Sequence, residues 1–234
     1  MNIIIVGATS GIGRALAESF LADGHRVAIT GRRAGLLEEI RQAFPETCVA
    51  ACHDVQSDNH PYADLVHELG GLDLFVYNAG YGSISKELDP ALEVDTTLTN
   101  VMGFVRAVAF AFDHFARSGG GQIVLTSSVA AVRGNGFAPA YSASKAFLSN
   151  YAEGLNLKAA RQRLPIVVTD IRPGFVATKM AQGRLFWVVP VPKAVAQIRT
   201  AIGWRCRVAY VSRRWRLVAA LLQRLPYGVL RRVG

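Results

Sequence analysis

Residues 6–20 read VGATSGIGRALAESF, and this stretch decides the fold because it joins an apolar strand to a helix through three glycines. Gly7, Gly11 and Gly13 have the spacing GxxxGxG, and apolar residues then recur at helical spacing (Ile12, Leu16, Phe20). Glycine lets the chain turn tightly and brings backbone close to a pyrophosphate, whose charge the amides at the helix start would face. The stretch predicts a dinucleotide-binding loop; a glycine-rich turn without a ligand is the alternative interpretation.

Seven short segments rich in apolar and β-branched residues alternate with segments of helical length. They are residues 2–7, 26–30, 48–55, 72–80, 122–128, 166–174 and 207–212. Such strands, separated by helices, indicate a parallel sheet covered on both faces and wound by right-handed crossovers. We therefore expect a Rossmann-like, doubly wound α/β fold with a seven-stranded parallel sheet and three layers, α/β/α. A length of 234 residues with 51% hydrophobic content suits a single domain over residues 1–234.

The composition also bears on location. No apolar run approaches the roughly 18 residues of a membrane span, and the first residues lack a basic leader with a cleavage site. We expect neither a transmembrane helix nor a secretory signal. The three cysteines have no metal-ligand spacing and no complete pairing, so they are interpreted as reduced core thiols of a cytoplasmic protein (Cys48, Cys52, Cys206). No metal site is expected.

The formal net charge of +9 is concentrated near the end of the sequence. The last acidic residue is Asp170, and residues 171–234 carry thirteen Lys and Arg. Such asymmetry suggests an anionic partner, but no nucleic-acid motif accompanies the charge, so we expect no nucleic acid. Within the basic segment 213–234, a helical projection separates apolar from polar side chains (Trp215, Val218, Leu221, Leu222, Leu225 against Arg213, Arg216, Gln223, Arg224). This helix either lies on anionic lipid or covers the sheet.

The second predicted strand ends in GRR, where NAD-binding folds place an acid to hold the ribose 2′-hydroxyl. The next acid is Glu38. Arg32 and Arg33 offer guanidinium groups suited to a 2′-phosphate, with Ser10 as an additional hydroxyl. The sequence therefore predicts NADP(H) as cofactor; the alternative is that the arginines belong to a solvated helix start.

The stretch YSASK places Tyr141 and Lys145 on one face of a helix, with the cation near the phenol oxygen. A nearby cation favours the phenolate, so such a tyrosine could exchange a proton with an alcohol or ketone near neutral pH. Ser128 ends the strand at 122–128 and would deliver its hydroxyl to the same edge; its spacing to the tyrosine favours it over Ser127.

Together with NAG at 78–80 and Asn100 on the following helix, this pattern resembles the short-chain dehydrogenase/reductase family in its one-domain form, over residues 1 to about 180. The resemblance implies Tyr141 as the acid/base, Lys145 lowering its pKa and holding the nicotinamide ribose, Ser128 bonding the substrate oxygen, and Asn100 supporting a water relay. It also implies a set of cofactor-binding residues (Gly7, Thr9, Ser10, Gly11, Ile12, Gly13, Arg32, Arg33, Asp54, Val55, Asn78, Ala79, Gly80, Tyr141, Lys145, Pro173, Gly174, Val176, Thr178). Val6 and Tyr77 depart from the family's usual threonine and asparagine.

The resemblance further implies a mobile substrate lid at about 179–192, and subunit contacts through helices at about 90–116 and 141–163. Apolar residues 185–189 suggest a bulky or lipophilic substrate, with packing against the domain as the alternative. We expect a homodimer. The predicted function is NADP(H)-dependent hydride transfer between nicotinamide and a carbonyl or secondary alcohol, preferably as a reductase. A non-catalytic, NADP-responsive binding protein on the same fold is the alternative.

Overall fold

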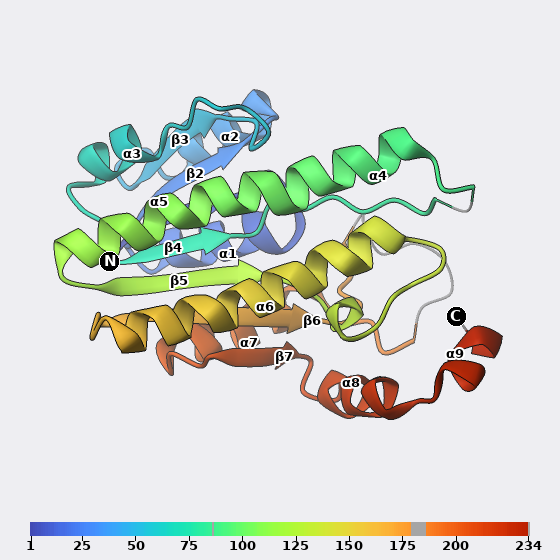
Figure 1. Ribbon diagram of the computed structural model, residues 1–234. Coiled ribbons are helices and arrows are strands. Elements are labelled where there is room, and N and C mark those ends of the chain that lie inside the picture. The colour runs from blue at the N-terminus through green and yellow to red at the C-terminus, as the bar shows by residue number, and fades with distance from the viewer. Residues whose placement is uncertain (86, 179–185, 234) are drawn as a thin grey trace.

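Seven strands form one parallel sheet in the computed structural model, which describes residues 1–85, 87–178 and 186–233 (Figure 1). They lie in the order β3-β2-β1-β4-β5-β6-β7, with every neighbouring pair parallel. The bounds are β1 (Asn2–Val6), β2 (Arg26–Gly31), β3 (Cys48–Cys52), β4 (Leu74–Tyr77), β5 (Gly121–Thr126), β6 (Ile166–Pro173) and β7 (Val208–Val211). The predicted Rossmann-like fold is confirmed. The order reverses between β1 and β4, where ligands bind in such sheets.

Helices cover both faces of this sheet and complete the predicted three layers (Figure 1). They are α1 (Gly11–Ala22), α2 (Ala34–Ala43), α3 (Tyr62–Leu69), α4 (Pro90–Thr97), α5 (Gly103–Ser118), α6 (Pro139–Arg161), α7 (Val191–Gly203), α8 (Trp215–Arg224) and α9 (Tyr227–Val233). In β1, Ile3 and Ile5 pack in one core cluster with α1, α2 and α7. Ile4 and Val6 pack in the other with α3, α5 and α6. Alternate side chains thus bury both faces of the strand.

Several strands end earlier than their apolar runs suggested. β3 stops at Cys52 and β4 at Tyr77, so Asp54 and the NAG segment lie in loops at the carboxyl edge. The predicted helix at 90–116 is interrupted by a π-helical turn, η1 (Leu98–Met102), and η2 (Val129–Val132) is a short 3₁₀ helix after β5. π turns within helices are frequent at functional sites, and this one contains Asn100.

The expectation of three core thiols is wrong for Cys52. Cys48 is buried, and burial raises the pKa of its thiol to about 11. Cys52 is exposed and Cys206 is half-buried. The reason is position: β3 is an edge strand, and Cys52 is its last residue.

The basic C-terminal segment forms α8 and α9 at one end of the molecule (Figure 1). α8 packs Trp215 and Ala219 against Val129 and Phe175. Leu221, which the helical projection placed on the apolar side, is exposed, because the buried side of the helix is centred on Trp215 and Ala219. Among the described residues, no helix combines the length and apolar character needed to cross a bilayer.

Candidate active site

The glycine loop packs directly against the NAG segment at the carboxyl edge. Gly7 has a φ of +86°, and a Cβ on it would lie 2.6 Å from the backbone nitrogen of Ala79. A Cβ on Gly13 would lie 2.1 Å from the Gly7 carbonyl oxygen, so no side chain fits at either position. Asn78 Nδ2 donates to the same carbonyl over 3.3 Å and its Oδ1 accepts from Thr126 Oγ1 over 3.0 Å. Gly7, Asn78 and Thr126 are therefore held together at the carboxyl edge of the sheet.

The first turn of α1 faces this edge without a side-chain cap. Ser10 is its N-cap residue, yet the Ser10 side chain makes no capping bond. Amides in the first turn of a helix have no partner within the helix, and together with the helix dipole they favour an anion. Of the other predicted loop residues, Ile12 packs against the core. The start of α1 therefore offers free amides to an anion such as a pyrophosphate.

Arg33 is the arginine that reaches the glycine loop. Its Nε donates to Thr9 Oγ1 over 3.1 Å, and its Nη2 donates to Ser10 Oγ over 2.8 Å. Arg32 points elsewhere and lies 3.9 Å from Asp54 Oδ2 in an exposed pair. The structure thus separates two arginines that the sequence could not distinguish, and it sets Arg33 between the two hydroxyls.

Asp54 and Val55, which the family resemblance implies as cofactor-binding residues, lie in the loop after β3. Asp54 Oδ1 accepts from the Gln56 amide over 3.1 Å, which shapes this turn. Val55 is buried against α5, where a Cβ on Gly103 would lie 2.8 Å from Val55 Cβ. The close packing anchors the loop beside the carboxyl edge.

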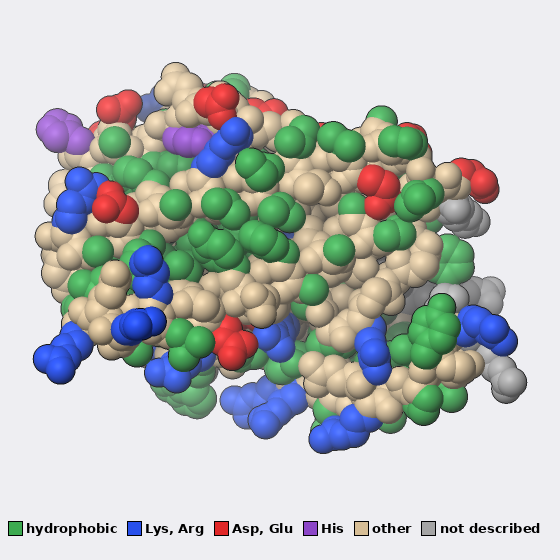
Figure 2. All heavy atoms as spheres, viewed as in Figure 1, with side chains coloured by type: hydrophobic (Ala, Val, Ile, Leu, Met, Phe, Trp, Pro, Cys, Tyr) green, Lys and Arg blue, Asp and Glu red, His purple; other side chains and the backbone are tan. Residues whose placement is uncertain are grey.

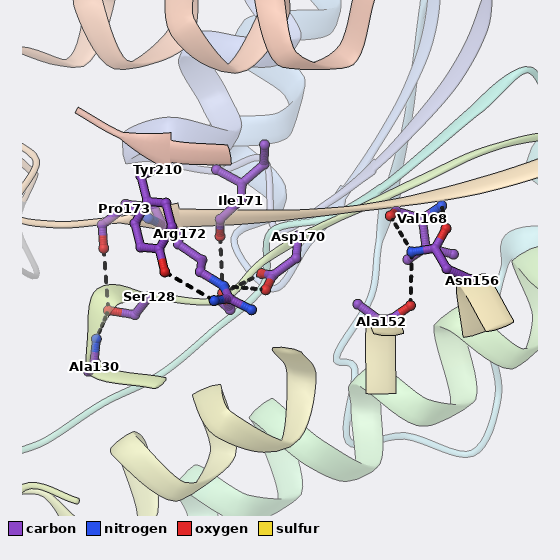
Figure 3. A network of polar contacts seen from close by, with 11 residues as sticks. Ser128, Ala130, Ala152, Asn156, Val168, Asp170, Ile171, Arg172, Pro173 and Tyr210 are labelled. Atoms are coloured by element: carbon purple, nitrogen blue, oxygen red, sulfur yellow. Dashed lines mark hydrogen bonds and ion pairs between the residues drawn. The ribbon is translucent and has the colours of Figure 1, made fainter. Parts of the chain in front are cut away.

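Ser127 and Ser128 point in different directions at the end of β5. Ser127 Oγ donates to the Asp170 carboxylate and, over 3.2 Å, to the Ile171 carbonyl oxygen in the interior. Ser128 Oγ accepts from the Ala130 amide over 3.1 Å and donates to Pro173 O over 3.4 Å (Figure 3). The Ser128 side chain also lies close enough to the Tyr141 phenol to lower its pKa. Of the two serines, Ser128 is therefore the one that lies beside the tyrosine.

Lys145 lies one helical turn after Tyr141 on α6. Its Nζ donates to Thr126 O over 2.9 Å and lies 5.6 Å from the centroid of the Tyr141 ring. Burial raises the pKa of Tyr141, while the Ser128 side chain lowers it. The Lys145 ammonium itself is directed to the Thr126 carbonyl. Burial lowers the pKa of Lys145 to about 8, and Asp170 acts in the opposite direction.

Asn100 is fully buried and organises the wall beside Lys145. Its Nδ2 donates to Tyr81 O over 2.7 Å and to Ser144 Oγ over 2.9 Å, and its Oδ1 accepts from the Tyr81 amide over 2.7 Å. A Cβ on Gly80 would lie 3.1 Å from Lys145 Nζ and 3.6 Å from Asn100 Oδ1. Asn100, Gly80 and Lys145 thus meet, although 65 positions separate Gly80 from Lys145 in the chain.

Tyr77, one of the two departures from the family pattern, has a structural role. Its hydroxyl donates to Thr99 O over 2.8 Å, which joins the end of β4 to the π turn that holds Asn100. Burial raises the pKa of Tyr77 well above its usual range, so the hydroxyl remains a donor.

A buried polar network that sequence reasoning missed lies beneath the site (Figure 3). Asp170 on β6 accepts from Ser127 and, over 2.6 Å, from Arg172 Nε. Arg172 Nη1 also donates to Tyr210 OH on β7 over 3.1 Å. Asp170 is 1% exposed, and buried carboxylates persist only when they are paired. The sequence did carry a signal for this network, because Asp170 is an acidic residue within an otherwise apolar strand segment.

The segment after β6 connects the site to both α1 and α8. A Cβ on Gly174 would lie 2.0 Å from Trp215 Cε2, so the indole lies directly on this glycine. Val176 is buried and bridges to Val189. Thr178 Cγ2 is 3.2 Å from where a Cβ on Gly11 would be. Residues 179–185 of the predicted lid lie outside the described residues, and the remainder leads into α7.

Gly82 is a further site residue without any sequence signal. A Cβ there would lie 2.4 Å from Tyr141 Cδ2, so the glycine leaves space for the tyrosine ring. Within the described residues, no group of three His, Cys, Asp or Glu side chains could hold a metal ion. Uncapped amides, hydroxyls, one arginine, a phenol and an ammonium suit a dinucleotide.

Comparisons with known proteins identify the family of this chain. The short chain dehydrogenase family model matches residues 1–187. An uncharacterized oxidoreductase of Mycobacterium tuberculosis is 34% identical over 190 residues, covering 76% of this chain and 74% of the relative. An NADP-dependent 3-hydroxy acid dehydrogenase of Escherichia coli is 29% identical over 185 residues, covering 75% and 73%. A short-chain dehydrogenase structure from Streptomyces avermitilis has a TM-score of 0.79 and 26% identity, covering 89% of this chain and 88% of that chain. The chain belongs to the short-chain dehydrogenase/reductase family and is an oxidoreductase.

Proposed function

We propose that this oxidoreductase uses NADP(H) to reduce a ketone or aldehyde, or to oxidise the corresponding secondary alcohol. The single observation that carries the proposal is the meeting of Ser128, Tyr141 and Lys145 at the carboxyl edge, beside the uncapped start of α1. The proposed holders of the dinucleotide are the glycine loop, Arg33, Asn78 and Lys145. The chemistry that a bound reduced nicotinamide supplies is hydride transfer to a carbonyl carbon.

The chain's own residues would manage the proton and the charge on the substrate oxygen. Ser128 donates a hydrogen bond to that oxygen, and Tyr141 gives it a proton as negative charge develops. A raised pKa keeps the Tyr141 phenol protonated at neutral pH, which is the form that reduction requires. The Lys145 ammonium then lies near the phenolate left behind and stabilises it. The reverse sequence of proton steps oxidises an alcohol.

Tyr141→Phe tests this assignment. We expect the variant to bind NADPH like the wild type and to lose about 10²-fold to 10⁴-fold in turnover on a panel of bulky carbonyl compounds. Tyr151→Phe is the matched control, since Tyr151 lies on the same helix with its ring stacked on Phe147. Full turnover by Tyr141→Phe would refute the assignment. Cofactor binding by the wild type without turnover on any carbonyl would favour the non-catalytic binding protein.

Arg33 supports the choice of NADP(H) over NAD(H). It is held by two hydroxyls at the glycine loop, and β2 ends in Gly31 without an acid for a ribose 2′-hydroxyl. The relative from Escherichia coli is described as NADP-dependent. Loss of charge-assisted bonds to a 2′-phosphate corresponds to about 1.5–3 kcal/mol. Arg33→Ala should therefore weaken NADPH binding about tenfold to hundredfold and leave NADH binding unchanged, measured by fluorescence titration.

Two further variants sharpen the cofactor test. Arg32→Ala should have a smaller effect, because its guanidinium is directed toward Asp54. Arg41→Ala is the control for charge alone, since that arginine is exposed and paired with Glu38 on α2. Equal NADPH affinities for wild type and Arg33→Ala would remove the basis for the NADP(H) assignment.

An aromatic cluster beside Gly174 supports a bulky or lipophilic substrate. Phe175 lies 5.3 Å from Trp215 between ring centroids, and Phe186 lies 5.1 Å from the same indole. Trp187 completes the cluster at 6.2 Å from Trp215. Aromatic rings that are partly exposed next to a reaction site favour apolar ligand surface. The proposed substrate therefore carries an apolar group next to its carbonyl.

We also propose that the chain works as a homodimer in the cytoplasm. The α4, α5 and α6 face carries partly exposed apolar side chains (Val94, Leu98, Met102, Phe147, Leu157). The space-filling view shows a green, hydrophobic area in its middle (Figure 2). Apolar surface of this kind favours pairing. Sedimentation equilibrium should give a dimer mass for the wild type and a monomer mass for Leu98→Glu; a monomeric wild type would contradict the proposal.

A further inference from the structure

The outward side of α8 is both cationic and apolar. Leu217 is 75% exposed and Leu221 is 61% exposed, one turn apart on the same side of the helix. Tyr227, at the start of α9, is 80% exposed and continues the apolar surface. A single exposed leucine is ordinary on a protein surface. A group of exposed apolar side chains indicates a surface that a partner covers. The group of three adjoins the arginines of the same two helices.

Five arginines surround these apolar side chains, and all are exposed (Arg213, Arg214, Arg216, Arg224, Arg231). Among the described residues, none of them forms an ion pair, while eight pairs are formed elsewhere. Every acid of the chain lies at or before Asp170, so no later side chain can neutralise them. The space-filling view shows basic and hydrophobic side chains together at the lower right, over α8 and α9, without acidic ones (Figure 2).

A hollow next to the start of α8 extends this surface. It has a volume of about 520 Å³ and is lined by Trp204, Arg213 and Arg216, among others. Trp204 is 71% exposed. Tryptophan beside cationic side chains is typical of protein surfaces at the boundary between lipid headgroups and acyl chains.

The opposite side of α8 is fixed to the body of the protein. Trp215 lies on Gly174, and Arg133 of the loop after Ser128 donates to the carbonyl oxygens that end the helix, at 2.9 Å from Leu222 O and 2.7 Å from Gln223 O. α8 therefore presents its outer residues rigidly rather than as a loose tail. The same helix contacts the proposed site on its inner side.

We propose that α8 and α9 dock this protein on an anionic lipid bilayer, with Leu217, Leu221 and Tyr227 inserted among acyl chains and the surrounding arginines on the headgroups. An amphipathic helix of this kind binds by apolar burial together with attraction to anionic lipid. A nucleic acid would use the arginines but leave the leucines in water. A second copy of this chain in a two-fold contact would oppose arginine with arginine. Only a bilayer satisfies both sets of side chains.

Flotation of the full chain with vesicles tests the proposal. We expect binding to phosphatidylcholine vesicles that contain one-third phosphatidylglycerol, and none to phosphatidylcholine alone. Each neutralised arginine should weaken binding about fivefold, so a triple variant, Arg213→Gln, Arg216→Gln and Arg224→Gln, should lose about 100-fold. Leu217→Ser with Leu221→Ser should lose on the order of tenfold or more, even at low salt.

A matched control removes the same charge at the exposed end of α6 and just after it. Lys158→Gln, Arg161→Gln and Arg163→Gln together should float like wild type. Equal flotation of the α8 variants and this control would overturn the proposal, as would absence of wild-type flotation. Loss with the arginine variant but not the leucine variant would also overturn it and indicate a polyanion such as nucleic acid. Because flotation needs no turnover, this result is separate from the fate of the proposed reductase activity.

Discussion

Asp170 is predicted to keep Lys145 charged. The Lys145 ammonium is buried, which lowers its pKa to about 8, and the Asp170 carboxylate is the group that raises it. Asp170→Asn keeps the shape of the side chain and removes the charge. If that charge stabilises the ammonium by about 1.4 kcal/mol, the pKa falls by about one unit. At pH 8 the protonated fraction of Lys145 then decreases from about one half to about one tenth.

Lysine Cε chemical shifts measure this titration directly and need no substrate. The chain has only five lysines, so a protein with ¹³C-labelled lysine gives few signals, and Lys145→Met assigns the buried one. We expect a midpoint near pH 8 for wild type and near pH 7 or below for Asp170→Asn. Asp113→Asn, which removes an exposed carboxylate paired with Arg117, should leave the midpoint unchanged.

A second measurement separates electrostatics from misfolding. Removing one partner of a buried pair typically costs about 3–5 kcal/mol, and Asp170→Asn leaves Arg172 without its carboxylate. Urea unfolding should show this loss, and Asp170→Glu, which keeps the charge, should retain a midpoint near that of wild type if it folds. A folded Asp170→Asn protein whose Lys145 midpoint stays within about 0.3 units of wild type would refute the reasoning.

Three further predictions concern pH, packing and the C-terminal helix. Because the folded pKa of Lys145 is below its usual value of 10.5, the unfolded chain binds more protons above pH 8; stability from this group therefore rises with pH, by about 1 kcal/mol between pH 8 and 9. Lys145→Met should abolish that increment in urea unfolding, and identical pH slopes for the two proteins would contradict the assignment. Gly82→Ala should displace the Tyr141 ring and reduce turnover at least tenfold, whereas Gly154→Ala, where a Cβ meets nothing within 4 Å, should be neutral or stabilising; equal activity of the two would refute the packing argument. Arg133→Ala should release the end of α8 and lower the unfolding free energy by about 1–3 kcal/mol, with faster proteolysis after residue 211 as the second readout; unchanged proteolysis would argue against the clamp.

Local sequence patterns were sufficient to predict the fold and to propose which residues form the site. The GxxxGxG loop, the seven apolar strands and the YxxxK spacing each depend on residues close in sequence, whose periodicity reports strand, turn and helix directly. Ser128 was distinguished from Ser127 by spacing alone, and the structure directs the two hydroxyls to opposite environments. The strand ends were less well predicted, because apolar residues continue into loops that the tertiary structure buries.

The sequence by itself determined that a parallel sheet forms, that its carboxyl edge gathers a glycine loop with Ser128, Tyr141 and Lys145, and that the last quarter of the chain is basic. Only the tertiary structure decided that Arg33 rather than Arg32 reaches the loop, that Asp170 lies beneath the site, and that Leu221 faces outward. These outcomes depend on contacts between segments far apart in the chain. Periodicity reports which side of one element is apolar, but it carries no information on which partner the element meets.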